Sequence, residues 1–301
     1  MWTLFEPIHA VIYFAPEARS AYERAGLRGF WRGYFAGRAA PLGAVGPAVV
    51  TASFFNFAPA FVARAIPGVW ELVTPEEALR ARLAGATSAL GRLLDGREAE
   101  AAVAASLLWR AVAELDFSGR VLASANVALP VPDSGFAALW QAATVLREHR
   151  GDGHFAALAA ADIDGCEGVV LRCGLDLRRE DMQPVRGWTD EAWDGALSRL
   201  TARGWIGADG ALTSAGRGPV GGALHRRDRD HADPARAGVR ERAALSQSHR
   251  RARSGGRSPA IRFCQVTASS VRAVTAVTWG PGCVRGCGCR GAPRRTGVLP
   301  R

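Results

Sequence analysis

Residues 189–217 of this 301-residue chain read TDEAWDGALSRLTARGWIGADGALTSAGR. Thr189 suits a helix N-cap, and the acids that follow it suit the positive end of a helix dipole. Trp193 and Leu200 lie at helical spacing, and Gly204 stands where a helix commonly ends. Residues 205–217 contain two short apolar runs on either side of an Asp-Gly turn, a pattern that favours a hairpin. The segment therefore predicts a helix followed by a small β-hairpin.

The composition of the chain changes at residue 217. Residues 1–217 contain 21 Arg and 24 Asp plus Glu, whereas residues 218–301 contain 17 Arg and 4 Asp plus Glu. The net charge of +10 therefore comes from residues 218–301, which have few Leu and no helical or strand periodicity. Such a segment cannot bury enough apolar surface to offset its ordering entropy. We interpret it as a disordered or out-of-frame basic tail. A nucleic-acid-binding arm and a zinc site at the cysteines of residues 283–289 are the alternatives.

The chain before residue 189 predicts helices rather than strands. Pro16 followed by an acid starts one helix, which we expect to extend to about Tyr34. The run TPEE, from Thr74 to Glu77, is a capping box ahead of a leucine-lined helical face. The fold class expected from these patterns is mainly α.

The cluster of Pro, Asp and Gly in residues 126–135 is the best internal boundary of the body. We therefore expect a helical domain with a ligand pocket over residues 1–130, and a second domain over residues 131–217. Residues 218–301 would follow as the tail.

An uncharged run at residues 39–63 is long enough to cross a membrane. Pro41, Pro47 and Pro59 break it into short pieces whose backbone groups lipid could not satisfy. We therefore expect a buried core hairpin and no membrane partner. The N-terminus shows no signal-peptide pattern, and the body has only two cysteines, which fits a cytoplasmic protein.

Six short motifs along residues 1–189 resemble those of a known protein family. They are EPIHA at 6–10, GYFAGR at 33–38, FNFAP at 55–59, LREHRGDGH at 146–154, DGCE at 164–167 and RGWT at 186–189. Residues 189–217 resemble the recognition helix and wing of MarR-like winged-helix proteins. Together with the motifs, nearly all of residues 1–217 resembles the actinobacterial SalK-type helix-turn-helix family. The resemblance implies a helical N-terminal region and a C-terminal winged helix-turn-helix domain with a β-hairpin wing, and it supplies no settled biochemical activity.

The charges on the predicted recognition helix oppose the function that its shape suggests. A reading helix should present Arg, Lys, Asn or Gln to base edges between cationic flanks. This helix begins with Asp190 and Glu191 and continues with Asp194, and like charges there repel phosphate. The candidate DNA-contact residues are four arginines: Arg186, Arg199, Arg203 and Arg217.

Two groups of residues are candidates for a small-molecule site. A ligand pocket is suggested by aromatic and amide residues: Phe30, Trp31, Tyr34, Phe55 and Asn56. A polar site is suggested by imidazoles and carboxylates, which ligate metals and exchange protons: Glu6, His9, His149, Asp152 and His154. Ordinary roles compete, because aromatic stripes usually form core. His149 also suits a helix end, and Asp152 suits the N-cap of a helix after a turn at residues 150–153. We expect no metal and no cofactor.

The leading hypothesis is a cytoplasmic winged-helix regulatory protein that binds DNA in response to a small molecule, with a homodimer as a candidate state. The alternatives are a protein-interaction module, or an accessory protein or enzyme of small-molecule (secondary) metabolism that uses the winged helix as a scaffold. The body contains no phosphate loop, nucleophile elbow or HExxH motif. Whether the protein is an enzyme stays open at this stage.

Overall fold

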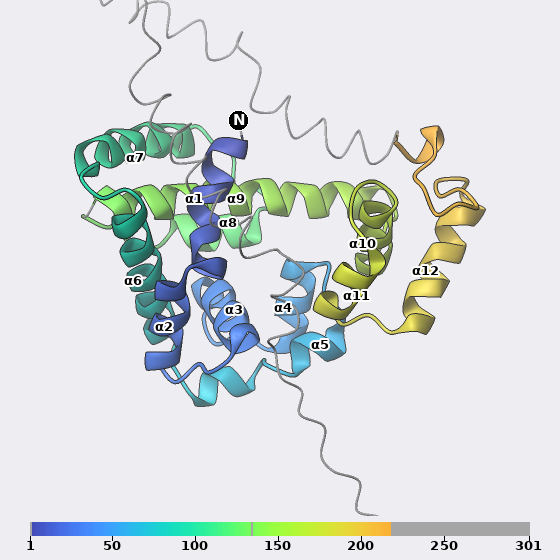
Figure 1. Ribbon diagram of the computed structural model, residues 1–301, viewed down its shortest axis with the longest axis horizontal. Coiled ribbons are helices and arrows are strands. Elements are labelled where there is room, and N and C mark those ends of the chain that lie inside the picture. The colour runs from blue at the N-terminus through green and yellow to red at the C-terminus, as the bar shows by residue number, and fades with distance from the viewer. Residues whose placement is uncertain (1, 134, 218–301) are drawn as a thin grey trace, which may run out of the picture.

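The computed structural model describes residues 2–133 and 135–217, shown in colour in Figure 1. These residues are mainly helical, as the sequence predicts, and no strand forms within them. The interpretations of residues 218–301 as a tail, a basic arm or a zinc site fall outside the described residues.

The elements follow one another with short connections. The first part of the chain forms α1 (Trp2–Phe14), α2 (Pro16–Arg24), α3 (Phe30–Ala39), η1 (Ala40–Leu42), α4 (Pro47–Phe54), α5 (Pro59–Ala63), η2 (Gly68–Glu71) and α6 (Pro75–Leu93). The second part forms α7 (Glu98–Ala113), α8 (Val121–Val127), α9 (Gly135–Ala160), α10 (Gly165–Cys173), α11 (Arg179–Arg186) and α12 (Asp190–Ala202).

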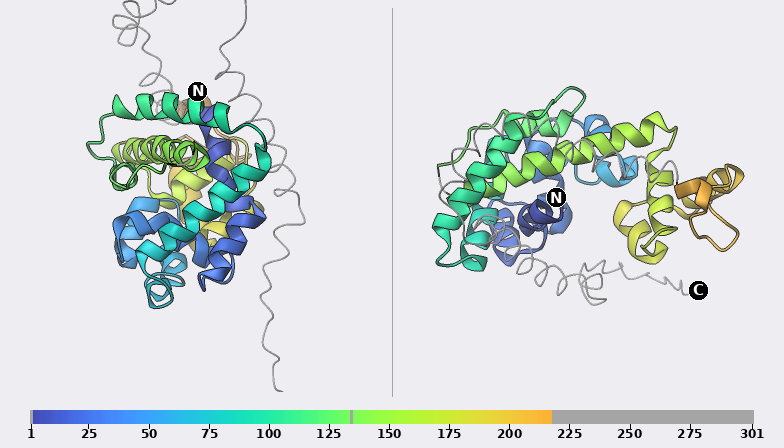
Figure 2. Two further views of the ribbon diagram at one scale, coloured as in Figure 1. Left: turned by 90° about the vertical axis from the view of Figure 1, so that its left-hand side faces the viewer. Right: turned by 90° about the horizontal axis from the view of Figure 1, so that it is seen from above.

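The 26-residue helix α9 is the axis of the molecule. Helices α1, α6, α7 and α8 pack around its first part, and α10–α12 lie at its other end (Figures 1 and 2). The larger hydrophobic core includes Leu139 to Leu146 of α9, and the smaller core begins at Leu158. The two cores therefore divide along α9, and the boundary expected between residues 130 and 131 does not separate them.

The turn expected at residues 150–153 is wrong, because α9 runs through it without a break. Gly153 serves close packing instead. A Cβ at this position would overlap the guanidinium of Arg120. Arg120 Nη1 donates a hydrogen bond of 3.0 Å to the carbonyl of His149. Gly153 therefore leaves space for the Arg120 side chain to pack against α9, and it does not form a turn.

The helix that starts at Pro16 is shorter than expected. It ends at Arg24, and Gly26 and Gly29 adopt φ of 92° and 84° before α3 begins. Only glycine adopts these angles without strain, so the chain turns there. By contrast, the capping box at Thr74 is confirmed, since Thr74 Oγ1 accepts from the backbone of Glu77 at 3.2 Å and the reciprocal bond is 2.8 Å.

The expected β-hairpin wing does not form as paired strands. The described residues contain one isolated antiparallel bridge, between Ile206 and Leu212. The turn itself is present, with Gly210 at φ 76°. Cross-strand bonds of 2.9 Å, from Gly207 N–H to Ala211 and from Thr213 N–H to Trp205, flank this bridge, and the outward N–H of Leu212 donates to the carbonyl of Gly174 at the end of α10, also at 2.9 Å. The pairing goes no further because residues 214–217 are helical.

Residues 39–63 fold as η1, α4 and α5 rather than as one long element. Phe54, Phe57 and Phe61 from this stretch are buried and lie within 6.2 Å, ring to ring, of Phe35 on α3. Among the described helices, none is both long and apolar enough to cross a membrane. The uncharged run therefore contributes to the core, as the sequence suggests.

Candidate functional site

Helices α11 and α12 are joined by a tight turn at residues 187–189. Gly187 ends α11 in the left-handed region with φ 75°. Trp188 Nε1 donates to the carbonyl of Asn56 at 3.1 Å, which ties the turn to the α4–α5 connection. The Thr189 hydroxyl then caps α12 by accepting from the backbone of Ala192 at 3.2 Å. A helix, a three-residue turn and a second helix therefore follow one another, and both helices pack against α10.

Helix α12 turns one face to α10 and the other to solvent. Trp193, Ala196 and Leu200 are buried. The opposite face carries residues at spacings of three to four that are all exposed: Glu191, Asp194, Ser198 and Thr201. This outward face is the one that a DNA groove would meet. Two of its four residues are acids, and one of these, Asp194, forms an ion pair with Arg179 of α11 at 2.9 Å.

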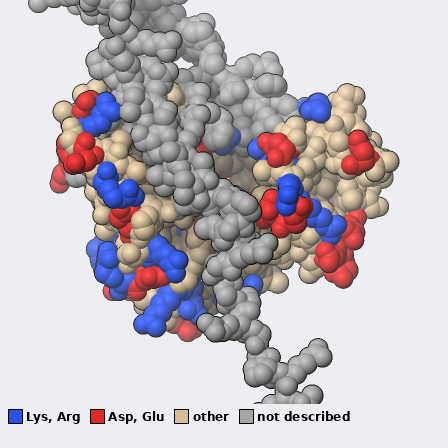
Figure 3. Space-filling view, viewed as in Figure 1, with Lys and Arg blue, Asp and Glu red and all other residues tan. Residues whose placement is uncertain are grey.

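The arginines of this unit are mostly neutralised by carboxylates. Arg199 contacts Asp164 at 2.5 Å and Glu167 at 2.8 Å, and Arg203 contacts Asp162 at 2.7 Å. Figure 3 shows acidic side chains gathered over α10–α12 with arginines between them. Residues 151–217 contain 7 Arg against 11 Asp plus Glu, so this part of the chain is acidic.

The other two DNA-contact candidates differ from these. Arg186 lies over the Phe57 ring, with its Cζ 4.6 Å from the ring centroid. Arg217 is exposed at the end of the described residues. The four arginines therefore do not form one cationic surface.

A buried polar cluster lies where α1, α3 and α9 meet. Arg38 donates from Nε and Nη2 to the two carboxylate oxygens of Glu148, each at 3.0 Å. Arg147 Nη1 donates to the same carboxylate at 2.8 Å. Burial alone would raise the pKa of Glu148, but Arg147 and Arg38 hold it well below its usual value. Glu148 is thus a charged anchor for two arginines inside the fold.

His9 extends this cluster as a neutral imidazole. The Thr144 hydroxyl donates to the carbonyl of Trp140 at 2.9 Å, so it accepts the Nδ1–H of His9, also at 2.9 Å. Nε2 of His9 is then the acceptor for the Tyr13 hydroxyl at 3.0 Å. Burial, and next the charge of Arg147, lower the pKa of His9 well below its ordinary value. The ring is fixed at both nitrogens and is structural in this arrangement.

A small cavity of about 10 Å³ borders the cluster, enough for about one water molecule. Arg82 of α6 lines it, with Nη1 donating to the carbonyl of Gly37 at 3.0 Å and Nη2 to Asn126 Oδ1 at 3.1 Å. Its Nε is buried and has no hydrogen-bond partner. A buried water at this place would satisfy that donor.

The five polar-site candidates do not converge on one point. Glu6 lies 3.8 Å from Arg147, near the cluster that contains His9. His149 Nε2 instead contacts the carbonyl of Asp116 at 2.8 Å, on the side of α8. His154 lies beside Phe155, with ring centroids 5.8 Å apart. Within residues 2–133 and 135–217, no three His, Cys, Asp or Glu side chains are placed to hold a metal ion.

Asp152 caps a helix other than the one expected. Its Oδ2 accepts from the backbone of Ala123 at 2.9 Å, so the carboxylate caps α8 from the middle of α9. Burial raises the pKa of Asp152 to about 6. A folded-state pKa above the unfolded value means that the stability from this group is present in acid and is lost as the pH rises through about 6.

We therefore predict a pH-dependent effect of Asp152→Asn. The amide oxygen still accepts from Ala123, but it carries no charge to desolvate. The variant should gain about 1 kcal/mol relative to the parent between pH 4.5 and pH 7, a figure reduced for partial solvent access. Urea unfolding of both proteins at the two pH values measures this. An identical pH dependence would show that Asp152 does not titrate abnormally.

The aromatic pocket candidates are mostly half-buried side chains that pack against the two cores. Phe30 is exposed, Trp31 and Tyr34 are partly buried, and all three contact one another. Phe55 adopts φ 58° and ψ −56°, and the hydrogen bond from Asn56 N to Phe54 O is 2.7 Å, which defines a rare γ-turn.

The γ-turn places Phe55 against the second half of α9. Its ring stacks on Phe155 at 5.2 Å, and the carbonyl of Phe55 lies so close to Gly165 that a Cβ there would overlap it. Asn56 Oδ1 is buried without a partner. The FNFAP motif therefore joins the two cores.

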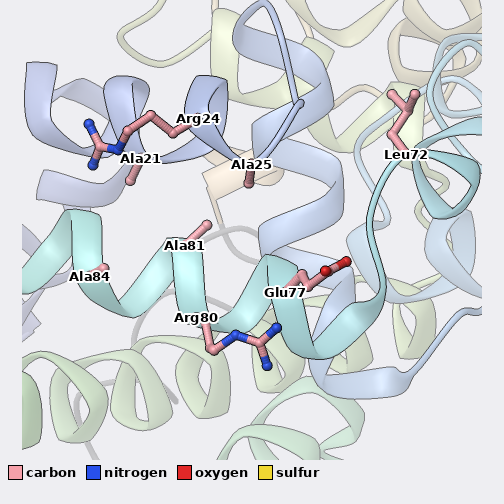
Figure 4. Close-up of a pocket in the computed structure, with 8 residues that line it drawn as sticks. All are labelled: Ala21, Arg24, Ala25, Leu72, Glu77, Arg80, Ala81 and Ala84. Carbon is pink, nitrogen blue, oxygen red and sulfur yellow. The ribbon is translucent and has the colours of Figure 1, made fainter.

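A larger surface groove of about 490 Å³ lies between α2 and α6 (Figure 4). Alanines form its floor, and Leu72, Arg24, Arg80 and Glu77 lie around it. The two arginines come from different helices and do not point to one place, and Glu77 already serves the capping box. The groove thus lacks the convergent polar groups of a ligand site.

The comparison with known families is consistent with the helix–turn–helix arrangement of α11 and α12. A model described as a helix-turn-helix family matches residues 1–254. The chain belongs to this helix-turn-helix family. The family match continues past residue 217, so it does not stop where the composition of the chain changes. No curated protein and no solved structure matches this helix-turn-helix chain.

Proposed function

We propose that this helix-turn-helix protein is a DNA-binding regulator in which α12 enters the major groove. The observation that carries the proposal is the family membership together with the α11–turn–α12 geometry. The exposed face of α12 projects at one end of the molecule, away from α9 (Figure 1). A homodimer belongs to the same proposal, because helix-turn-helix proteins commonly bind two half-sites of DNA as dimers. A cytoplasmic location is proposed with it.

The finer assignments of the fold are proposals as well. We propose that residues 205–213 act as a short wing, held by the Ile206–Leu212 bridge, in the manner of MarR-like proteins. The SalK-type assignment is also a proposal, and it rests on the short sequence motifs found between residues 6 and 189. A small-molecule response is supported by the contact between the turn at 187–189 and the α4–α5 connection of the helical core.

Charge favours a second candidate function. The outward face of α12 carries Glu191 and Asp194, and Arg199 and Arg203 are held by carboxylates. A groove lined by phosphates would be repelled by such a face. An accessory protein or enzyme of small-molecule metabolism that uses this domain as a scaffold would carry no such penalty.

Electrophoretic retardation of DNA from upstream of the coding sequence, with the full chain, separates the two. We expect retardation at low salt, and Ser198→Glu should weaken it on the order of tenfold, because the new charge stands on the groove-facing side of α12. Ser106→Glu on α7 is the matched control, since Ser106 is also an exposed helical serine and faces solvent elsewhere.

The arginine-rich residues 218–301 make this control necessary. They would bind any DNA through phosphate contacts, whatever α12 does. Retardation that both serine variants leave unchanged would assign the binding to those residues and refute the role of α12. Absence of retardation at low salt would favour the scaffold function.

A further inference from the structure

Arg186 differs from the other arginines of the α10–α12 unit. Five of them have a carboxylate within 4 Å: Arg172, Arg178, Arg179, Arg199 and Arg203. Arg186 makes no ion pair and no side-chain hydrogen bond within the described part of the chain, and its Nε is buried. Its one contact of note is the Phe57 ring, 4.6 Å from its Cζ.

The surroundings of Arg186 are aromatic and cationic. The rings of Phe57 and Tyr34 lie 5.6 Å apart, and those of Tyr34 and Tyr13 lie 5.2 Å apart. The Tyr34 hydroxyl accepts from Arg38 Nη1 at 3.4 Å. Burial lowers the pKa of Arg186, and the positive charge of Arg38 adds to this effect.

Among the described residues no carboxylate forms an ion pair with Arg186, although Glu6 Oε2 is buried without a hydrogen-bond partner. Arg38 holds both oxygens of Glu148, and Arg147 holds one of them as well. Glu6 lies 3.8 Å from Arg147. Arg186 is partly buried and only its Nε is a buried donor without a partner, so part of the guanidinium stays accessible. A partly desolvated guanidinium without a counter-ion carries an energetic cost, which an anionic ligand from solvent would offset.

We propose that Arg186 binds the oxyanion group, carboxylate or phosphate, of a small ligand at the contact between the helical core and α11, beside Tyr34 and Arg38. Planar guanidinium groups bind such oxyanions through paired hydrogen bonds. Arg186 directly precedes Gly187 of the helix–turn–helix turn, so this ligand would bear on the placement of α12. That consequence rests on the proposed regulatory function, whereas the binding itself does not.

The test is calorimetric titration of the full chain with inorganic phosphate and, separately, with benzoate, at ionic strength held constant with sodium chloride. We expect saturable binding of at least one probe, and the probe that binds identifies the oxyanion class. Arg186→Gln should weaken it by about tenfold or more, and Arg186→Lys should weaken it less because it keeps the charge.

Arg64→Gln is the matched control. Arg64 also stacks on a phenylalanine, with its Cζ 5.3 Å from the Phe61 ring centroid, but it is exposed. Its replacement should leave binding unchanged. Circular dichroism checks that each variant is folded. If Arg186→Gln does not fold, the affinity of Arg186→Lys for the probe tests the proposal instead.

The proposal is overturned if neither probe binds saturably, or if Arg186→Gln and Arg186→Lys both bind as the parent does. Since no DNA is present, this result is independent of the retardation experiment. Binding of a probe without DNA retardation would keep the ligand site and remove the regulatory function.

Discussion

Glu148→Gln is expected to lower the free energy of unfolding by about 3–5 kcal/mol, because it leaves the buried guanidinium of Arg38 without its carboxylate and removes one of the two carboxylates near Arg147. Arg38 and Glu148 are almost inaccessible to solvent, with side-chain exposures of 5% and 2%. The pKa of Glu148 is held below its ordinary value, so its stabilising charge is present at neutral pH and is lost only as the pH falls through that lowered pKa. Urea unfolding at pH 7 measures the effect.

Two companion proteins make this result specific. Glu114→Gln changes an exposed glutamate and should alter stability by less than about 0.5 kcal/mol. Arg38→Met combined with Glu148→Leu removes the bidentate pair together, and it should recover part of the loss because no unpaired Arg38 remains. A loss below about 1 kcal/mol in Glu148→Gln would mean that water reaches the cluster and that the charges there are not buried.

Gly187→Ala is expected to lower the free energy of unfolding by about 3 kcal/mol and to loosen α11 and α12 from the core. About 1 kcal/mol comes from the left-handed backbone at φ 75°, and about 2 kcal/mol comes from overlap of the new methyl group with the Phe61 side chain. Thermal unfolding, followed by the near-ultraviolet signal of the tryptophans, measures the change.

Gly204→Ala separates the two causes. Gly204 also has a positive φ, 67°, but a Cβ there would meet nothing within 4 Å. Its substitution should therefore cost only the backbone part, about 1 kcal/mol. Equal losses at the two glycines would show that residue 187 is not pressed against α5, and the inferred tie between the turn and the helical core would be wrong.

Local signals in the sequence predicted the parts of the fold that local physics decides. The capping box at Thr74, the cap at Thr189 and the helix end before Gly204 all depend on residues within a few positions of one another. Asp164 and Glu167 form a second capping box of the same pattern, which sequence reasoning missed although the signal was present.

The errors arose where distant residues decide the local structure. Gly151 and Gly153 look like a turn, but Arg120, some thirty positions earlier, fills the space beside Gly153 and the helix continues. The hairpin is limited to one bridge because residues 214–217 turn into a helix directly after it, and the outward N–H of Leu212 bonds to Gly174 on α10. Neither contact can be read from spacing along the chain.

The candidate site was predictable only in part. His9 and Glu6 do lie in or beside a buried polar cluster, but its centre, Glu148 with Arg38, was not singled out. The available signal was that Glu148 lies on the same helix as the apolar residues 139–146, where an unpaired charge would be costly. Its partner Arg38 is 110 positions away, so the pairing itself could come only from the fold.

Hydrogen–deuterium exchange of the full chain, with and without upstream DNA, tests the central claim that α12 is the DNA-reading element. The account predicts slower exchange in peptides from Asp190–Ala202 and unchanged exchange in Glu98–Ala113 of α7. DNA that binds while leaving exchange in α12 unchanged would contradict it.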